Sequence, residues 1–375
     1  MKICEIEKCT GCFACMNICE HKAIQITYDK MGKSIPIIDE NRCIKCNLCE
    51  TICPQNRSKR LVEPKKIFAA WSKNKTDQID SASGGVATVF SRNIIENKGI
   101  VCGAVCENKE TTHMCADSLQ QIEKMRGSKY VQSNIDYVYK EIKEHLLSLK
   151  NVLFIGTPCQ VAGLKAYLNK EYKKLITVDL ICHGVPPQAY ITEHLNALLK
   201  NKWDRYSFRG KYDYKLTVYY NDQIVYSRYP EHEKYFFPFM KGMIVRDNCY
   251  NCEYACKKRI ADITIGDFWG IKHSSLTRSY NGRISLVMLN TDKGEDFWEN
   301  VKDNFVFEER TFLEAANELQ TNLREPSPKH IERSIFEQLY PIYGYEKSIS
   351  KTKLGKNIGK LYLKYKIYTL LKHSR

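Results

Sequence analysis

The sequence contains no long hydrophobic run. None of its apolar stretches approaches the roughly 18 residues that a membrane-spanning helix needs. Acidic residues stand at positions 5 and 7, where a secretory signal would carry its apolar segment. The nine histidines form no H-E-x-x-H spacing, so the pattern does not predict a catalytic zinc site. We therefore expect a cytoplasmic chain of two or more domains, because 375 residues exceed the size of one typical domain.

Acidic residues are also absent from the C-terminal end. Residues 351–375 hold seven lysines and one arginine, which supply 8 of the formal net charge of +15. Because the excess is concentrated there, the charge does not predict a nucleic-acid partner. Lys356, Lys360 and Lys364 recur beside an apolar stripe, which predicts an amphipathic helix. Two roles stay open for this basic tail: packing on the preceding domain, or a peripheral contact with an anionic membrane surface.

Cysteine, by contrast, is abundant. There are 17 cysteines, and nine of them lie within the first 53 positions. A secreted disulfide scaffold would be short and would follow a signal peptide, whereas clustered cysteines in a cytoplasmic chain more often bind metal or carry redox chemistry. Cys102, Cys106 and Cys115 lie in strand-like segments and are predicted to be core residues. Cys4 fits none of the spacings.

Two blocks of cysteines repeat the spacing C-x2-C-x2-C-x3-C, which is typical of ferredoxins with two 4Fe-4S clusters. There, three thiolates bind one cluster and the fourth binds its neighbour, so Cys19 is expected to join the second block and Cys53 the first. Zinc ribbons are the alternative, but they rarely use four cysteines so tightly spaced, twice. The first block departs from the pattern in one respect, because Glu20 rather than proline follows it. We predict a two-cluster domain over residues 1–58 with the ligands Cys9, Cys12, Cys15, Cys19, Cys43, Cys46, Cys49 and Cys53.

From residue 67 the sequence alternates between strand and helix patterns, which predicts an α/β domain over residues 67–345 with a mixed, largely parallel sheet. A hairpin over 214–229, turning near Asn221, is expected to continue that sheet. The fold class is thus an α+β ferredoxin-like two-cluster module followed by an α/β domain, with residues 351–375 as the basic tail. Strands are predicted at 67–71, 100–105, 111–116, 152–156, 175–181, 261–265 and 284–289, and helices at 85–96, 135–149, 158–168 and 189–199.

Four further cysteines are dispersed along the second domain. Cys159 begins a helix directly after one buried strand, and Cys182 follows the next strand. If these strands pair in parallel, both thiols emerge at the edge of the sheet where α/β proteins place their ligands. Cys249 and Cys252, spaced C-x2-C, could supply two more thiolates to a third cluster. By themselves, these residues are equally consistent with ordinary core cysteines.

Six motifs occur in order along this domain. Two of them lie in polar, glycine-containing loops that could hold a phosphate, although each loop is also typical of a helix N-cap or a turn. Together with the cysteine-rich start, the motifs resemble the family of coenzyme F-420 hydrogenase/dehydrogenase beta subunits over nearly the whole chain, to about residue 345. The motifs are Ser83–Gly85, Gly127–Ser133, Gly156–Gln160, Cys182–Pro186, Cys249–Cys252 and Arg259–Gly270.

The resemblance implies a flavoprotein that binds FAD and a further iron-sulfur cluster. It implies that a third 4Fe-4S cluster is held by Cys159, Cys182, Cys249 and Cys252, with Cys256 as a competing fourth ligand. Asp267 and Trp269 are either structural or part of the flavin pocket. The implied FAD contacts are Ser83, Gly84, Gly85, Gly127, Ser128, Lys129, Gln132 and His183.

These features predict an FAD- and iron-sulfur-dependent oxidoreductase. FAD accepts two electrons and releases them singly, while each cluster carries one. We expect reduced ferredoxin, or another low-potential donor, to supply electrons that reduce an unidentified organic substrate, with surface-polysaccharide metabolism as the candidate setting. The alternatives are a non-catalytic electron-transfer subunit serving a partner enzyme and a structural zinc module. The sequence assigns no catalytic acid or base.

Overall fold

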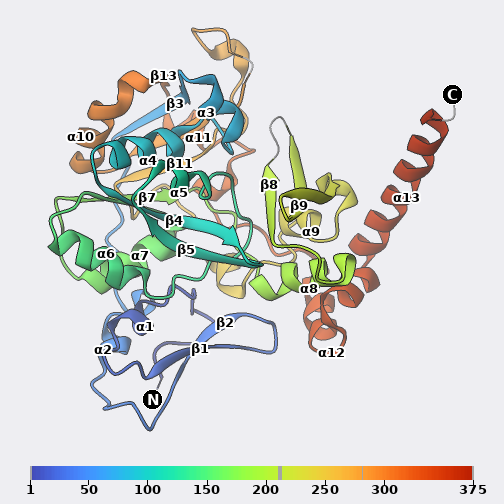
Figure 1. Ribbon diagram of the computed structural model, residues 1–375, viewed down its shortest axis with the longest axis horizontal. Helices are drawn as coiled ribbons and strands as arrows, with labels where there is room; N and C mark the ends of the chain where they lie inside the picture. The colour runs from blue at the N-terminus through green and yellow to red at the C-terminus, as the bar shows by residue number, and fades with distance from the viewer. Residues whose placement is uncertain (1, 210–212, 281, 374–375) are drawn as a thin grey trace.

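The N-terminal region is a small module of short elements at one end of the molecule (Figure 1). The computed structural model describes residues 2–209, 213–280 and 282–373, with side chains through residue 365; positions 1 and 374–375 of the predicted domains lie outside this set. Two strands of the module pair as an antiparallel hairpin. Its elements are α1 (Ala14–Ile18), β1 (Ile24–Tyr28), β2 (Ser34–Ile38), α2 (Leu48–Thr51) and η1 (Pro54–Asn56).

The second region is built on an eight-stranded sheet with the order β13-β3-β12-β11-β7-β6-β4-β5. Its centre, β11-β7-β6-β4, is parallel, and the outer pairings are antiparallel, so the sheet is mixed as expected. Strands β3, β4, β6, β7 and β11 run in one direction. The bounds are β3 (Lys66–Ser72), β4 (Ile100–Glu107), β5 (Glu110–Ala116), β6 (Val152–Gly156), β7 (Leu175–Leu180), β11 (Ile263–Asp267), β12 (Ser285–Leu289) and β13 (Phe305–Glu309).

Helices cover both faces of this sheet, which explains why the central strand β6 is apolar throughout. Leu153 of β6 packs into the core under α4 and α10, whereas Val152 and Phe154 face the core under α6 and α7. The α6–α7 face also carries α1 of the N-terminal module. The helices are α3 (Lys75–Asp80), α4 (Val86–Glu96), α5 (Leu119–Glu123), α6 (Val138–Leu147), α7 (Pro158–Leu168), α10 (Asp292–Val301) and α11 (Phe312–Ala315).

The predicted hairpin forms, but it does not continue the main sheet, so that prediction is wrong. Strands β9 (Tyr214–Tyr220) and β10 (Gln223–Arg228) join β8 (Arg205–Arg209) in a separate three-stranded antiparallel sheet. Its apolar side chains share a core with α8 (Gln188–Leu199), α9 (Phe236–Met240) and α12 (Arg333–Lys351). This second core consists largely of aromatic rings. The hairpin packs against these rings instead of pairing with the main sheet.

The basic tail forms α13 (Lys353–His373), which extends away from the rest of the molecule (Figure 1). Its first half packs on the domain through the buried Ile358. Further along, Tyr365 stacks on His232 at 4.9 Å, and Arg228 lies 3.7 Å from the ring of Tyr362. None of the described helices is both long enough and apolar enough to cross a membrane.

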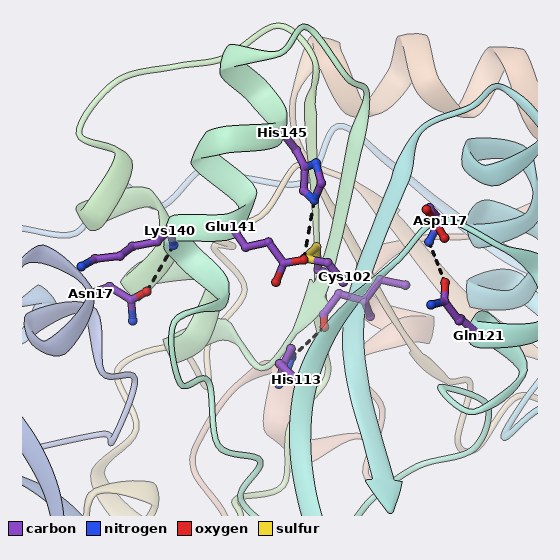
Figure 2. Close-up of a disulfide and its surroundings, with 10 residues drawn as sticks. Asn17, Cys102, His113, Asp117, Gln121, Lys140, Glu141 and His145 are labelled. Atoms are coloured by element: carbon purple, nitrogen blue, oxygen red, sulfur yellow. Dashed lines mark hydrogen bonds and ion pairs between the residues drawn. A yellow bond between two sulfur atoms is a disulfide. The ribbon is translucent and has the colours of Figure 1, made fainter.

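Strands β4 and β5 carry a disulfide that the sequence interpretation missed (Figure 2). Cys102 and Cys115 were predicted to be separate core residues, but they face each other across the two strands and form a bond. The other predicted core cysteine, Cys106, is buried with a free thiol. The two-residue turn at Asn108 and Lys109, both in the left-handed region, sets the register that brings the pair together.

Candidate metal centres

Four cysteines of the two repeated blocks line a cavity in the N-terminal module, and we name it cavity A. Three of these cysteines come from the first block, and the fourth is Cys53 at the end of the second. All four are buried, at 7–8% exposure, among apolar neighbours such as Ile3 and Phe13. The cysteines of cavity A are Cys9, Cys12, Cys15 and Cys53.

The second cavity, cavity B, lies in the same module. It is lined by the first three cysteines of the second block and by the last cysteine of the first block, Cys19. Each block therefore contributes one cysteine to the other block's cavity, which is the exchange the spacing predicted. The cysteines of cavity B are Cys19, Cys43, Cys46 and Cys49.

Equivalent positions in the two blocks share one backbone conformation. Gly11 and Lys45 have φ of +66° and +56°, and Phe13 and Asn47 have φ of +53° and +60°. These left-handed residues curl each loop around its cavity, so that successive cysteines point to the same centre. The positive φ explains glycine and asparagine at two of the positions; Lys45 and Phe13 adopt it at a cost.

The donor set of each cavity fits a 4Fe-4S cluster. Among the residues that the structure describes, no three His, Cys, Asp or Glu side chains converge on one metal-ion position. Thiolates that bind the corners of an iron-sulfur cube surround a cavity rather than a point, and both cavities have this arrangement. Four cysteines and an apolar lining match such a cluster.

Cys4 is a fifth cysteine at cavity A, and sequence reasoning left it unassigned. Its thiol hydrogen-bonds with Cys53 and Cys9, and these bonds raise the pKa of Cys4 well above its ordinary value. The bond from Cys4 is also the main cause that lowers the pKa of Cys9, to about 6. The hydrogen bond therefore favours a thiolate at Cys9, the form that binds iron.

A third set of cysteines, group C, gathers at the carboxyl edge of the main sheet. Strands β6 and β7 pair in parallel, so Cys159 at the start of α7 and Cys182 just after β7 emerge together. Cys249 and Cys252 join them from η3 (Asp247–Asn251) and the residue that follows it, and the charges of the four thiols act on one another. Burial raises the pKa of Cys159 to about 11 and that of Cys249 to about 12.

Cys256, the competing ligand, turns away from group C. Its thiol donates to the backbone carbonyls of Glu253 and Lys258, at 3.6 and 3.3 Å. The charge of Cys252, in contrast, is among the causes that raise the pKa of Cys182. Cys252 is therefore the better placed of the two alternatives.

Cavity A and group C are neighbours. Helix α7, which begins next to Cys159, packs on α1 through Gly163. A β-carbon at Gly163 would lie only 2.9 Å from the β-carbon of Cys12. The three centres therefore follow the order B, A, C, from the end of the N-terminal module to the edge of the main sheet.

The predicted flavin contacts are dispersed, and several hold the protein's own backbone. The Ser83 hydroxyl donates to the carbonyl of Ile284 at 3.0 Å, and the Gly84 amide donates to the Ser285 hydroxyl at 2.9 Å. Gly85, with φ of +89°, precedes α4 as its N-cap.

The Gly127 loop is likewise engaged. Gly127 has φ of +77°, and the Ser128 hydroxyl bonds with Tyr130. The Lys129 ammonium donates to four backbone carbonyls between residues 124 and 127. Gln132 lies at cavity A instead, where its amide nitrogen donates to the carbonyls of Thr10 and Gly11 at 3.4 and 3.2 Å.

A polar cluster lies near His183, and we name it the Arg209 cluster; of its residues, the sequence analysis singled out Asp267 alone. Arg209 pairs with Asp267, donates to the Tyr130 hydroxyl at 2.9 Å, and lies 3.8 Å from the ring of Tyr214. Partial burial lowers the pKa of His183, and the charges of Asp267 and Arg209 act on it as well. The Arg209 side chain is only 4% exposed, and its Nη1 has no hydrogen-bond partner among the described residues. Buried hydrogen-bond donors almost always have a partner, so the unpartnered Nη1 indicates that a bound molecule supplies an acceptor at this position.

Comparison with known proteins finds a matching family model for each of the two regions. Residues 8–57 match the family model of the 4Fe-4S dicluster domain, and residues 149–314 match that of the C terminus of the coenzyme F420 hydrogenase/dehydrogenase beta subunit. The coenzyme F420-dependent sulfite reductase of Methanocaldococcus jannaschii is 25% identical over 349 residues, which are 87% of this chain and 50% of that protein. The chain thus spans half the length of that relative.

Two further similarities come from methanogens. The F(420)H(2) dehydrogenase of Methanosarcina mazei has a subunit, designated F, that is 24% identical over 368 residues, which are 88% of this chain and 94% of that protein. A chain of the xenon-derivatised F420-reducing NiFe hydrogenase complex from Methanosarcina barkeri is similar with a TM-score of 0.47 and 19% identity, covering 71% of this chain and 93% of that chain. By their matches to the family models, residues 149–314 are similar to the C terminus of coenzyme F420 hydrogenase/dehydrogenase beta subunits, and residues 8–57 are similar to 4Fe-4S dicluster domains.

Proposed function

We propose that the protein is an iron-sulfur oxidoreductase that passes electrons through three 4Fe-4S clusters, held by cavity B, cavity A and group C. The observation that carries this proposal is the spatial arrangement of three sets of four cysteines. Cavity A adjoins group C because Cys12 of cavity A contacts Gly163 of α7, the helix that also carries Cys159. Each cluster, when bound, accepts and releases one electron at a time. The domains proposed for these roles are residues 1–58 and 67–345, with 351–375 as a tail.

The chain's own residues prepare these sites in two ways. First, backbone amides point at the sulfur atoms: Ala23 N–H donates to Cys19 Sγ at 3.4 Å, and Gly184 N–H donates to Cys182 Sγ at 3.4 Å. Such bonds stabilise thiolate sulfur and influence the potential of the cluster it holds. Second, burial of the four block cysteines of cavity A keeps water from that centre.

The redox site proper is proposed at the Arg209 cluster, beside group C. FAD is the proposed cofactor there, and the residues fit it in part. Gly85, Gly127, His183 and the unpartnered Arg209 Nη1 would hold it, whereas Ser83, Gly84 and Ser128 bond within the protein. Gln132 and Lys129 are committed to other contacts and are left out of the proposal. FAD would exchange two electrons with a substrate and single electrons with the clusters.

The names of the relatives favour coenzyme F420 as one redox partner of this site, with ferredoxin or another low-potential protein as the other. The organic substrate reduced by the chain, including a sugar-linked one, would then be bound beside His183. Because the chain spans half of the sulfite reductase, reduction of sulfite itself is not part of the proposal.

The test begins with anaerobic purification. We expect about twelve iron atoms per chain, a visible spectrum that dithionite bleaches, and released FAD in near-equal amount. Zinc in place of iron would overturn the proposal and favour a structural module. The purified chain is then mixed separately with reduced coenzyme F420 and with dithionite-reduced ferredoxin, and bleaching of the clusters is followed. Bleaching by neither would overturn the electron-transfer role.

A non-catalytic subunit is the second candidate, and it is favoured by the matching lengths of this chain and the dehydrogenase relative, which is itself a subunit. It predicts cluster reduction by a partner protein but no turnover with any small-molecule hydride carrier. Steady-state oxidation of reduced coenzyme F420 by the isolated chain, with a dye as acceptor, separates the two candidates.

For the tail, we propose docking on the domain as the main role of α13, because Ile358 is buried and Tyr365 stacks on His232. A peripheral contact with anionic lipid is the alternative, carried by the lysines of the same helix. Flotation with anionic liposomes distinguishes these two roles. The experiment compares the full chain with a chain that ends at Ser350. Salt-sensitive binding of the full chain alone would favour the membrane contact.

A further inference from the structure

Three arginine side chains are almost completely enclosed by the protein, each at 1–2% exposure: Arg246, Arg259 and Arg333. Two of them have carboxylate partners. Arg259 pairs with Asp179 at 3.2 Å, and Arg333 pairs with Glu337 and Asp247 at 2.8 and 3.1 Å. Arg246 forms no ion pair with any carboxylate in the part of the chain that the structure describes.

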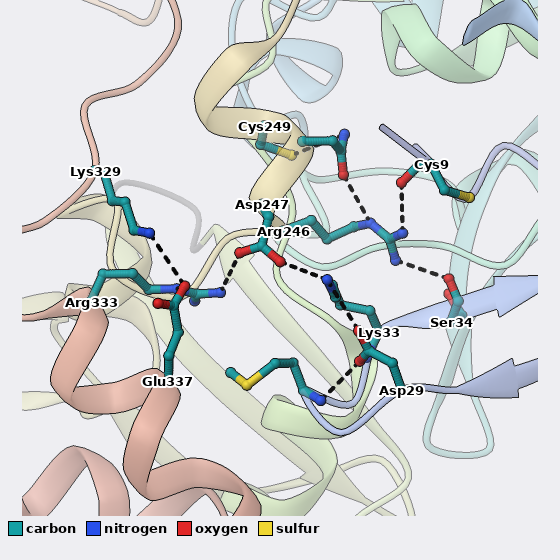
Figure 3. Close-up of polar contacts among 12 residues, drawn as sticks. Cys9, Asp29, Lys33, Ser34, Arg246, Asp247, Cys249, Lys329, Arg333 and Glu337 are labelled. Carbon is teal, nitrogen blue, oxygen red and sulfur yellow. Dashed lines mark hydrogen bonds and ion pairs between the residues drawn. The ribbon is translucent and has the colours of Figure 1, made fainter. Parts of the chain in front are cut away.

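The hydrogen bonds of Arg246 are nevertheless well satisfied (Figure 3). Its guanidinium donates to the carbonyl of Cys9 at 3.0 Å, to the carbonyl of Ser34 at 3.1 Å, to the Gln132 side-chain oxygen at 2.6 Å, and to Asn248 at 3.3 Å. All four acceptors are neutral. They satisfy the donors but leave the positive charge without a counter-ion.

The adjacent carboxylate does not supply one. Asp247 accepts from Lys33 at 2.6 Å and from Arg333 at 3.1 Å, so its ion pairs among the described residues are with those two cations (Figure 3). A buried charge is strongly unfavourable unless it is paired, so a negative group has to lie nearby in the working protein.

Arg246 contacts cysteine residues of two different centres. Its guanidinium donates to the carbonyl of Cys9 of cavity A at 3.0 Å, and its own carbonyl accepts from the backbone amide of Cys249 of group C at 3.0 Å. Its charge also acts on the thiols of Cys9, Cys159 and Cys249. A 4Fe-4S cluster held by four thiolates is an anion, and its charge is one of the factors that set its potential. Arg246 therefore lies between the two sites at which the proposed function places anionic clusters.

We infer that Arg246 is the shared counter-ion of the clusters in cavity A and group C, and that its charge raises the reduction potential of both. The inference rests on the proposed function. Reduction adds a negative charge to a cluster, and a fixed cation in a low-dielectric interior stabilises the reduced form more than the oxidised form. One cation between two neighbouring clusters raises the reduction potentials of both. The difference between the two potentials therefore stays small, which favours electron transfer between the clusters. None of the hydrogen bonds of Arg246 joins it to a residue that lines cavity B, so we expect the potential of that cluster to depend less on Arg246.

The experiment is an anaerobic redox titration of the whole iron-loaded chain, followed by electron paramagnetic resonance. The variants are Arg246→Met, which removes the charge, and Arg246→Lys, which keeps it. Arg333→Met is the matched control, because it removes an equally buried guanidinium that has carboxylate partners. Cys43→Ser identifies the signal of cavity B, which serves as the internal reference.

We expect Arg246→Met to lower the equilibrium constant for reduction of two clusters at least tenfold, which corresponds to about 59 mV for a one-electron couple. Cavity B, Arg246→Lys and Arg333→Met should stay near the parent values. If Arg246→Met does not retain its iron, Arg246→Gln gives the same comparison with hydrogen-bond donors kept. Unchanged potentials in the neutral variants, or equal losses in Arg246→Lys, would overturn the inference. Absence of three clusters in the parent chain would instead overturn the proposed function.

Discussion

Cavities A and B are built from one repeated spacing and one repeated backbone conformation, yet their surroundings differ. The four block cysteines of cavity A are all buried, and α7, Gln132 and Arg246 pack around their loop. In cavity B, Cys46 is exposed and Cys19 and Cys43 are half-buried. The spacing specifies a four-thiolate site in both cases. What packs against the site then decides whether it faces solvent or another centre.

This difference indicates a direction for the proposed electron path. A redox protein from solution can approach cavity B, whose rim includes the exposed side chains of Ile44 and Leu48. Cavity A is enclosed and adjoins group C, so it suits transfer within the molecule. The two cavities should therefore respond differently to the same kind of substitution.

The largest effect is expected from removing one ligand at each cavity. Cys12→Ser and Cys46→Ser should each lose about four irons per chain. Only Cys12→Ser should also weaken the fold, because Cys12 belongs to the core shared with the α6–α7 face, whereas Cys46 is exposed. Iron analysis and thermal midpoints at a fixed scan rate measure both effects.

The control for that pair is Cys4→Ser. Cys4 lines cavity A but lies outside the repeated spacing, so this variant should keep its full iron content. Iron loss from Cys4→Ser as great as that from Cys12→Ser would mean that Cys4, rather than a residue of the motif, is a ligand.

The next prediction concerns His194 and the pH dependence of the stability of the fold. We expect a smaller effect here, one that leaves both cavities unchanged. Both ring nitrogens of this buried histidine bond with carboxylates, Glu233 on one side and Glu346 on the other. Burial disfavours the imidazolium, but the two carboxylates outweigh it and raise the pKa of His194 to about 9. The ordinary value in an unfolded chain is about 6.5.

Because the folded protein binds this proton more tightly, the stabilisation is complete below about pH 6.5 and disappears as the pH rises through about 9. The difference amounts to about 3 kcal/mol. We expect the thermal midpoint of the iron-loaded chain to fall over this interval, and His194→Gln to flatten the fall. His145→Gln, on the surface of α6, should leave it unchanged. A parent profile that is flat from pH 6.5 to 9 would contradict the prediction.

Local features of the site could be predicted from the sequence, and distant ones could not. The ligands of cavities A and B lie within a few residues of one another, so their spacing carries the geometry. Cys159 and Cys182 were placed together because each follows a buried strand, and those strands pair in parallel. Arg246 belongs to no motif: its role depends on segments far apart in the chain, such as those of Cys9 and Gln132.

The missed disulfide and the misplaced hairpin show the same limit. The disulfide follows from the register of a two-residue turn, a signal that is present in the sequence between Cys102 and Cys115 but was not used. The hairpin over 214–229 was recognised from its own residues. Which sheet it joins depends on the aromatic core that α8, α9 and α12 supply, and no local pattern carries that information.

The smallest effect tests the contact that distinguishes the two cavities. Alanine at Gly163 would place its β-carbon 2.9 Å from both Cys12 and the Tyr139 hydroxyl, so α7 and α1 would have to separate. Overpacking of this kind costs about 1–3 kcal/mol, which exceeds the gain of about 1 kcal/mol from replacing a helical glycine. Gly359→Ala is the matched control, because it lies in α13 with no atom within 4 Å of the added carbon, and it should be neutral or slightly stabilising.

We expect Gly163→Ala to lower the thermal midpoint and to slow the reduction of group C by a donor acting at cavity B. The rate of reduction at cavity B itself should stay unchanged in stopped-flow measurements. Equal behaviour of the two alanine variants would mean that cavity A is not coupled to the α/β domain through this contact.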